Sequence, residues 1–283
     1  MQITKSSALT WIGLLSLLCP NGVMAQASEK TCQANPLVCA IKTIGSDVAY
    51  VFTSPLRLTP KGGVQLAVFA AATTGFVLKL DDKIDEELAF EGYEFSSQPS
   101  KELAKLGQVY DDVKPANFAI GLTATTFAGG LVLRDRKLLQ TSRLLVESIL
   151  LTQLFTSWSK GVFGRARPYV DYGPRDFNLF KFSKAEDFKS MPSGHVSSVF
   201  ALMTVMAKQY DHWWVEIPAY TFAVSVAFQR MTTRNHWASD TIVGGALGYW
   251  VGSTLVRKQH QPSKGASLNF YPVGNRLGVM MNF

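Results

Sequence analysis

Long apolar stretches, separated by shorter polar ones, make up the middle of the chain. Six of them have the length and composition of helices and lack the strict alternation of a half-buried strand: residues 64–80, 116–133, 138–160, 193–209, 215–229 and 236–257. Pro192 is expected to open the fourth stretch and Pro218 to sit in the first turn of the fifth, where a helix tolerates proline. The tail, residues 268–283, is strand-like, and Gly274 and Asn275 suit a hairpin turn. The pattern predicts an all-α fold, a single helical bundle, with a short C-terminal β-like hairpin.

The apolar stretches fit either water or lipid as their surroundings. Several approach the length of a membrane span, which needs about 20 residues. They are rich in Ala, Thr and Gly, however, Glu147 interrupts one of them, and the mean hydropathy of the chain is only +0.09. A buried helix of a soluble bundle is also apolar all round. The composition slightly favours a periplasmic bundle associated with a membrane, and a polytopic membrane protein remains open.

The N-terminus has the pattern of an export signal. Lys5 precedes an apolar run from Ala8 to Cys19, and Val23-Met24-Ala25 offers a cleavage site. The run is shorter than the ~20 residues that span a bilayer. We therefore expect a signal peptide at residues 1–25 and a periplasmic or membrane-associated protein whose active site faces the periplasm.

Two cysteines remain after the expected cleavage. Cys32 and Cys39 would both lie in an oxidising compartment, which favours a local disulfide over two reduced thiols. No repeat, low-complexity tract or linker divides the remaining chain. We expect an N-terminal segment at 26–62, one helical domain at 63–258 and a tail at 259–283.

The candidate chemistry begins with RMTTRNHWASD, residues 230–240. The formal charge of +7 suits an acidic partner: a phosphate ester, an anionic membrane surface or nucleic acid. On a helix, His236 and Asp240 would share one face, so the carboxylate could hold one ring nitrogen and leave the other free. Arg230 could bind a phosphate through two parallel hydrogen bonds. The alternative is a solvated His–Asp pair near a helix start.

Two upstream segments add donors for an anion. Ser193 and Gly194 read as a helix N-terminus, where free N–H groups and the helix dipole favour an anion, and His195 is placed beside it. Lys160 and Arg167 would lie two turns apart on one side if their helix continued to Pro168. The alternatives are an ordinary helix start and a solvated basic helix end.

Together these residues meet the needs of phosphate-ester cleavage through a phosphohistidine. One imidazole must have a free lone pair, cations must stabilise the oxygens of the transition state, and a second imidazole can protonate the leaving alcohol.

The order and spacing Lys160-x6-Arg167-Pro168, Pro192-Ser193-Gly194-His195 and Arg230-x5-His236-x3-Asp240 resemble the three-part signature of the type 2 phosphatidic acid phosphatase superfamily. This superfamily also includes bacterial acid phosphatases and vanadium haloperoxidases. The likeness extends over about residues 64–257. It implies a metal-independent phosphatase without a cofactor, in which His236 is the nucleophile, Asp240 its partner and His195 the general acid. Lys160, Arg167, Ser193, Gly194 and Arg230 would hold the phosphate.

Some positions depart from the signature or leave its use open. Gln229 stands where the family usually has Ser, so we expect a tuned site rather than a lost one. Arg234 could read the substrate or face solvent, and the acidic run at 81–87 is expected to be a solvated connector. Aromatic residues at 169–188 could cover the phosphate as a lid or pack back on the bundle; they are Tyr169, Tyr172, Phe177, Phe180, Phe182 and Phe188.

The substrate would be a phosphorylated lipid, as a monoester or pyrophosphate, or a small soluble phosphomonoester. The sequence does not choose between them. A vanadium haloperoxidase or a non-catalytic member of the fold is a weaker interpretation. Nucleic-acid binding is weaker again, because no recognisable module interleaves basic and aromatic residues.

Overall fold

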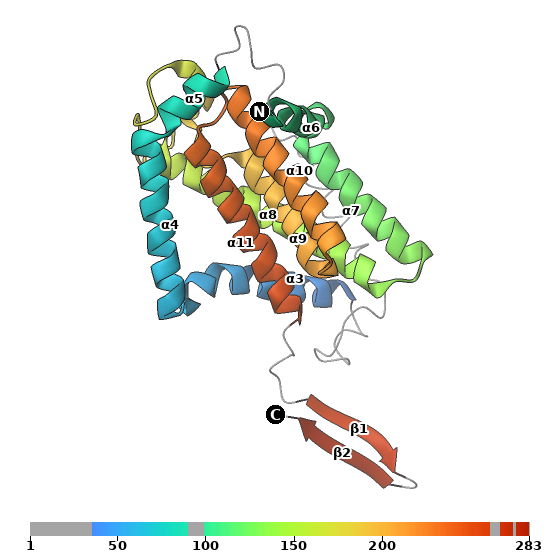
Figure 1. Cartoon of the computed structure of the whole chain (residues 1–283). Helices are drawn as coiled ribbons and strands as arrows, with labels where there is room; N and C mark the ends of the chain where they lie inside the picture. The colour runs from blue at the N-terminus through green and yellow to red at the C-terminus, as the bar shows by residue number, and fades with distance from the viewer. Residues whose placement is uncertain (1–35, 90–98, 261–266, 274–275, 283) are drawn as a thin grey trace. The chain divides into compact units, whose positions relative to one another are not determined.

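The computed structural model describes residues 36–89, 99–260, 267–273 and 276–282. The expected signal peptide and Cys32, one half of the expected disulfide, lie outside the described residues. The six predicted helices are all present (Figure 1): α4 (Pro60–Lys79), α7 (Pro115–Val132), α8 (Arg136–Phe163), α9 (Gly194–Tyr210), α10 (Trp213–Thr232) and α11 (Ala238–His260). The all-α prediction is confirmed.

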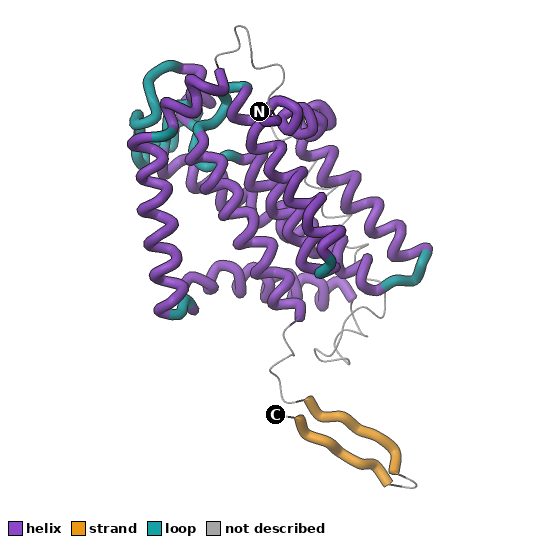
Figure 2. Tube along the Cα trace, viewed as in Figure 1, coloured by secondary structure: helices purple, strands orange, loops and turns teal. Residues whose placement is uncertain are grey.

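Three further helices were not predicted from the hydrophobic pattern. They are α3 (Pro36–Thr53), α5 (Asp81–Ala89) and α6 (Pro99–Val113). Two of them, α5 and α6, are shorter and more polar than those six. Short 3-10 turns lie at Ser54–Arg57, Pro168–Val170 and Glu186–Phe188. In the tail, β1 (Ser267–Val273) and β2 (Arg276–Asn282) pair antiparallel, with Val273 opposite Arg276, as the predicted hairpin requires (Figure 2).

The larger of two compact units runs from Val48 to Val256 and contains all the candidate site residues. The domain limits at 62/63 and 258/259 stay predictions. Within this unit α10 packs against α6 and α9, while α8 packs against α7 and α9. Its core is built from buried aliphatic residues of α8, α9 and α11, such as Leu144, Leu145, Leu202, Val205 and Val251. Helices α8, α10 and α11 therefore pack around α9.

Two proline positions differ in detail from the prediction. Helix α9 begins at Gly194, with Ser193 as its N-cap, so Pro192 lies just before the helix rather than opening it. Pro218 lies inside α10, beyond the first turn, because α10 begins earlier than its apolar pattern, at Trp213. The exposed Trp213 and Trp214 extend that helix without contributing to the core.

Helix α4 carries its apolar residues on the outside. Val64, Leu66 and Val68 are more than half exposed. Of the residues in the most apolar part of this helix, 6% are buried. Among the described residues, α4 is the one helix long and apolar enough to cross a membrane.

Candidate active site

A row of glycines on α11 brings the second and third sequence motifs together. A Cβ at Gly248 would overlap the carbonyl of Ser197 on α9, and one at Gly244 would lie 2.8 Å from the Ser193 carbonyl oxygen. Only glycine permits this close approach without a shift of the backbone. The approach lets the Ser193 amide donate a hydrogen bond of 3.1 Å to the Asp240 carbonyl. The N-termini of α9 and α11 therefore meet.

The first motif reaches the same place by leaving its helix. Helix α8 ends at Phe163, and Gly164 follows in the left-handed conformation at φ +53°. The expectation that one helix carries both Lys160 and Arg167 was therefore wrong. Lys160 stays in the last turn of α8, its Nζ 3.7 Å from where a Gly194 Cβ would lie, whereas Arg167 lies beyond the helix end.

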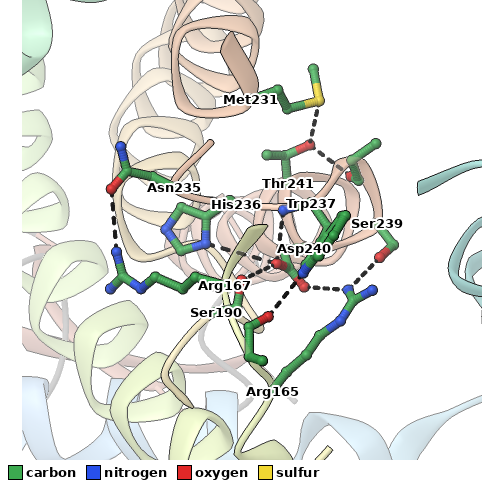
Figure 3. Close-up of polar contacts among 12 residues, drawn as sticks. Arg165, Arg167, Ser190, Met231, Asn235, His236, Trp237, Ser239, Asp240 and Thr241 are labelled. Atoms are coloured by element: carbon green, nitrogen blue, oxygen red, sulfur yellow. Dashed lines mark hydrogen bonds and ion pairs between the residues drawn. The ribbon is translucent and has the colours of Figure 1, made fainter. Parts of the chain in front are cut away.

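His236 and Asp240 do not share a helix face either, because α11 begins at Ala238 and His236 lies before it. Both side chains are buried. The His236 Nδ1 is 3.9 Å from the Asp240 Oδ2, an ion-pair distance too long for a hydrogen bond (Figure 3). The His236 Nδ1 has no hydrogen-bond partner among the described residues. The carboxylate thus faces this nitrogen and leaves the opposite ring nitrogen, Nε2, as the one available for other partners.

Other groups hold the Asp240 carboxylate in place (Figure 3). Arg165 Nη1 donates to its Oδ1 at 2.6 Å, while the Ser190 hydroxyl at 2.5 Å and the Trp237 amide at 3.0 Å donate to its Oδ2. Burial alone would raise the pKa of Asp240, but the charge of Arg165 and the contacts of His236 and Ser190 hold this pKa below its ordinary value. The carboxylate beside His236 is therefore a fixed anion.

Arg165 is held in turn by α5. Its Nη2 donates to Asp81 Oδ2 at 2.7 Å, and both side chains are fully buried. Asp81 also accepts hydrogen bonds from the amide and the hydroxyl of Ser239, at 2.9 and 2.6 Å. The prediction of a solvated acidic run at 81–87 was wrong for Asp81, because the unpaired positive charge of a buried arginine requires a buried anion.

On the other side of the site, α6 contributes an acid that the sequence did not single out. A Cβ at Gly107 would overlap the Ser225 carbonyl on α10, so the two helices touch there. One turn further along α6, Asp111 Oδ1 lies 3.1 Å from Arg230 Nη1 and 3.3 Å from His195 Nε2. The imidazole of His195 is about one-third exposed, at 32%, whereas that of His236 is 2% exposed. The site is thus open at His195 and closed at His236.

The predicted phosphate-binding residues surround the two histidines. We call Lys160, Arg167 and Arg230 the cation cluster. The charges of Lys160 and Arg167 act on both imidazoles, and that of Arg230 acts on His195. Arg167 is held loosely, by contacts of 3.4 Å to Asn235 Oδ1 and to Glu186 Oε2. The Ser193 hydroxyl is buried without a hydrogen-bond partner among the described residues. These groups have donors to spare for an anion.

Burial and positive charge set the protonation of the site. Burial, opposed by Asp240, lowers the pKa of His236 to about 3. Burial and then Arg230, opposed by Asp111, lower the pKa of His195 to about 4. Burial and then Arg167 lower the pKa of Lys160 to about 8. With no anion bound, both imidazoles are therefore neutral at pH 7, and a bound phosphate would raise their pKa values.

Gln229 and Arg234 both contact residues that surround the site, through hydrogen bonds and ion pairs. Gln229 Nε2 donates to Gln108 Oε1 at 2.9 Å and to Asp111 Oδ2 at 3.3 Å, so it ties α10 to α6. Arg234 pairs with Asp85 and Asp171, each at 2.8 Å, so it does not face solvent alone. Arg234 anchors the loop that carries His236.

The segment between the first two motifs folds back on the end of α8. The Arg167 amide donates a hydrogen bond of 2.8 Å to the Asp187 carbonyl. The Ser190 amide donates one of 3.0 Å to the Arg165 carbonyl. Its aromatic residues divide: the Phe177 ring packs on Arg165, while Tyr172 and Phe180 are more than 60% exposed. One part of this segment packs against Arg165, and another part is exposed.

Sequence reasoning missed Asp81, Asp111 and Asn235 because their partners are distant in sequence. The available signal was charge balance, since buried Arg165 and Arg230 each need an anion. Within the described residues, no group of three or more His, Cys, Asp or Glu side chains is arranged to hold a metal ion.

These features define a helical protein in which two histidines and the cation cluster lie at one site. Residues 142–263 match the model of the PAP2 superfamily, which confirms the resemblance drawn from the three motifs. The matched region contains all three motifs, from Lys160 to Asp240.

Several curated proteins named as lipid A 1-phosphatases share part of this sequence. A "Lipid A 1-phosphatase" of Porphyromonas gingivalis is 34% identical over 77 residues, covering 24% of this chain and 17% of that protein. A "Lipid A 1-phosphatase" of Rhizobium johnstonii is 32% identical over 105 residues, covering 36% and 41%. The matches therefore span less than half of either relative.

Among solved structures, the chain is similar to a transmembrane PAP2 type phosphatidylglycerolphosphate phosphatase from Bacillus subtilis. The TM-score is 0.46 at 17% identity, and the match covers 70% of this chain and 96% of that one.

Proposed function

We propose that this protein is a lipid phosphatase that removes a terminal phosphate through a phosphohistidine on His236. The observation that carries the proposal is the meeting of two neutral imidazoles with the cation cluster around one site. The buried His236 turns its Nδ1 toward the Asp240 carboxylate at 3.9 Å, which leaves Nε2 to attack. The family match and the relatives named as lipid A phosphatases support the same chemistry.

In the first step, His236 Nε2 forms a bond to phosphorus and the bond to the leaving alcohol oxygen breaks. Lys160, Arg167 and Arg230 stabilise the charge on the non-bridging oxygens, with the Ser193 hydroxyl as a neutral donor. His195, once protonated beside the bound phosphate, gives its Nε2 proton to the leaving oxygen. In the second step, His195 takes a proton from water, whose oxygen displaces His236 from phosphorus and releases inorganic phosphate.

Two features outside the phosphate site support a lipid as substrate. An apolar cavity of about 340 Å³ adjoins the start of α11, lined from α4, α5, α10 and α11 by Phe76, Ile84, Leu88, Phe228, Met231 and Ile242 among others. Helix α4, which forms one wall, exposes apolar side chains suited to a membrane. The expected export signal would place the site on the periplasmic side.

The test is phosphate release by the purified protein in EDTA. It would be offered phosphatidic acid in detergent micelles and, in parallel, a small soluble phosphomonoester. We expect turnover of the lipid at a rate well above that of the soluble ester. The variant His236→Asn should abolish it, and the exposed His212→Asn, outside the site, should not. Turnover confined to the soluble ester would instead indicate an acid phosphatase. A folded wild-type protein inactive on both would overturn the proposal.

A further inference from the structure

Asp111 lies beside the position that a leaving group would take in this site. Its Oδ1 lies between Arg230 Nη1 at 3.1 Å and His195 Nε2 at 3.3 Å. In the proposed reaction, on which this inference rests, His195 Nε2 delivers its proton to the leaving oxygen. That oxygen must come within hydrogen-bond distance of the same nitrogen. The carboxylate therefore lies next to the leaving group. It does not lie on the opposite side of the phosphorus, where His236 would attack.

The position of Asp111 is held by its surroundings. Gln229 Nε2 donates to its other oxygen, Oδ2, at 3.3 Å, and Arg230, which is mostly buried, fixes Oδ1. The preceding residue, Tyr110, is fully buried and packs edge-on against the His195 ring, with ring centroids 6.2 Å apart. Close contact of α6 with α10 at Gly107 places this turn of α6. The carboxylate is thus part of the site wall, while its 31% exposed side chain still faces the open end.

We propose that Asp111 is a specificity-determining residue that selects phosphate monoesters of uncharged alcohols over pyrophosphates. A pyrophosphate would bring its second, anionic phosphate to the His195 side of the site, next to the carboxylate. Repulsion between this second phosphate and the Asp111 carboxylate would be strong, because the site is partly buried. An uncharged leaving group meets no such repulsion, and a hydroxyl on it could donate a hydrogen bond to the carboxylate. Arg230 is the cation on this side of the site and is already paired with Asp111. Its positive charge therefore offsets less of the repulsion between Asp111 and a second phosphate.

The experiment compares Asp111→Asn with wild type on two lipids in the same detergent micelles, phosphatidic acid and a prenyl pyrophosphate. The amide keeps the size of the side chain and removes its charge. We expect the ratio of kcat/KM for monoester over pyrophosphate to fall by about tenfold or more. Asp112→Asn, an exposed neighbour that bonds Gln108 and not the site, should leave the ratio unchanged.

A structural or positioning role alone would lower both activities together, so an unchanged ratio in Asp111→Asn overturns the inference. If that variant does not fold, wild type still decides the matter through product inhibition. Inorganic pyrophosphate should inhibit more weakly than inorganic phosphate, and equal or tighter inhibition overturns the inference. Failure of the proposed function is distinguishable, because wild type would then release phosphate from neither lipid.

Discussion

Arg165 Nη1 lies 2.6 Å from Asp240 Oδ1 in the interior of the protein, where neither side chain is exposed. Through this pair, Arg165 holds in place the carboxylate that faces His236. Through its other nitrogen, Arg165 also binds Asp81 of α5, so three charged groups are buried as one set. A buried ion pair contributes little net stability when complete, but removal of one partner is costly.

The first prediction concerns Asp81→Asn, which leaves Arg165 with one carboxylate instead of two. We expect the free energy of unfolding to fall by about 3 kcal/mol. Turnover should also fall while KM changes little, because Asp240 loses its fixed position but the cation cluster remains. Denaturant unfolding and phosphate release would measure the two effects. Asp82→Asn, one residue along and exposed, is the matched control. Equal behaviour of the two variants would mean that Asp81 is dispensable to the site.

The second prediction separates the two histidines. With p-nitrophenyl phosphate, whose leaving group needs no proton, His195→Gln should still form the phosphoenzyme and then hydrolyse it slowly. We therefore expect a burst of about one nitrophenol per site, followed by a steady rate lowered by about 10²–10⁴-fold, the usual contribution of acid–base catalysis. His236→Gln should give no burst. Rapid-quench measurements would record both, and a burst from His236→Gln would assign the nucleophile elsewhere.

The third prediction concerns Arg167, whose guanidinium is held only by contacts of 3.4 Å and has donors to spare. Arg167→Ala should lower kcat by about 10²–10³-fold, as expected for loss of a donor that stabilises transition-state charge. Arg167→Lys should recover part of this loss, since a point charge remains but the bidentate fork does not. Arg175→Ala, exposed and bonded only to the Leu78 carbonyl among the described residues, serves as the control. Kinetics of Arg167→Ala that equal this control would place Arg167 outside the site.

The features that the sequence predicted correctly have two separate causes. Helices with a long apolar face were predictable because burial of that face determines them. The site residues were found because their order along the chain is that of a known signature. Their local geometry was not predictable: whether α8 continues to Arg167 depended on Gly164, and whether His236 lies on α11 depended on where that helix begins.

The residues behind the site were missed for a different reason. Asp81, Asp111 and Asn235 have partners more than 60 residues away, and no local pattern reports such pairings. The acidic run at 81–87 looked solvated because its composition is polar. Only the fold shows that Asp81 pairs with the buried Arg165 and that Asp85 pairs with the partly exposed Arg234.

The fourth prediction concerns pH. In the free protein, His236 is neutral above about pH 3 and His195 is neutral above about pH 4. A neutral His195 needs a proton from the substrate, which a phosphate monoester carries below its second pKa of about 6. We expect kcat/KM to be highest between about pH 4 and pH 6 and to fall as the pH rises above that range. Initial rates across the pH range would test this, with unfolding followed at each pH. A kcat/KM that rises from pH 6 to pH 8 would contradict it.

The same pKa values give a separate expectation for stability. An unfolded histidine has a pKa near 6.5, so between pH 6.5 and about 3 the unfolded chain binds more protons than the folded one does at His236. The free energy of unfolding should therefore fall as the pH falls below 6.5. The fall should be smaller in His236→Asn, which has no imidazole to protonate at that position.

The last prediction concerns α4, whose exposed apolar side chains cost free energy in water unless something covers them. If a bilayer covers them, Leu66→Gln combined with Val68→Gln should weaken partition into phospholipid vesicles by about tenfold or more, since burial of each such side chain contributes about 1.5–3 kcal/mol. Both residues are exposed, at 56% and 63%, so folding should not suffer. Flotation with vesicles would measure the partition, and Val109→Gln on α6, 50% exposed, is the matched control. If both variants float as wild type does, another part of the chain holds the protein at the membrane. If wild type does not float, α4 is covered by something other than lipid.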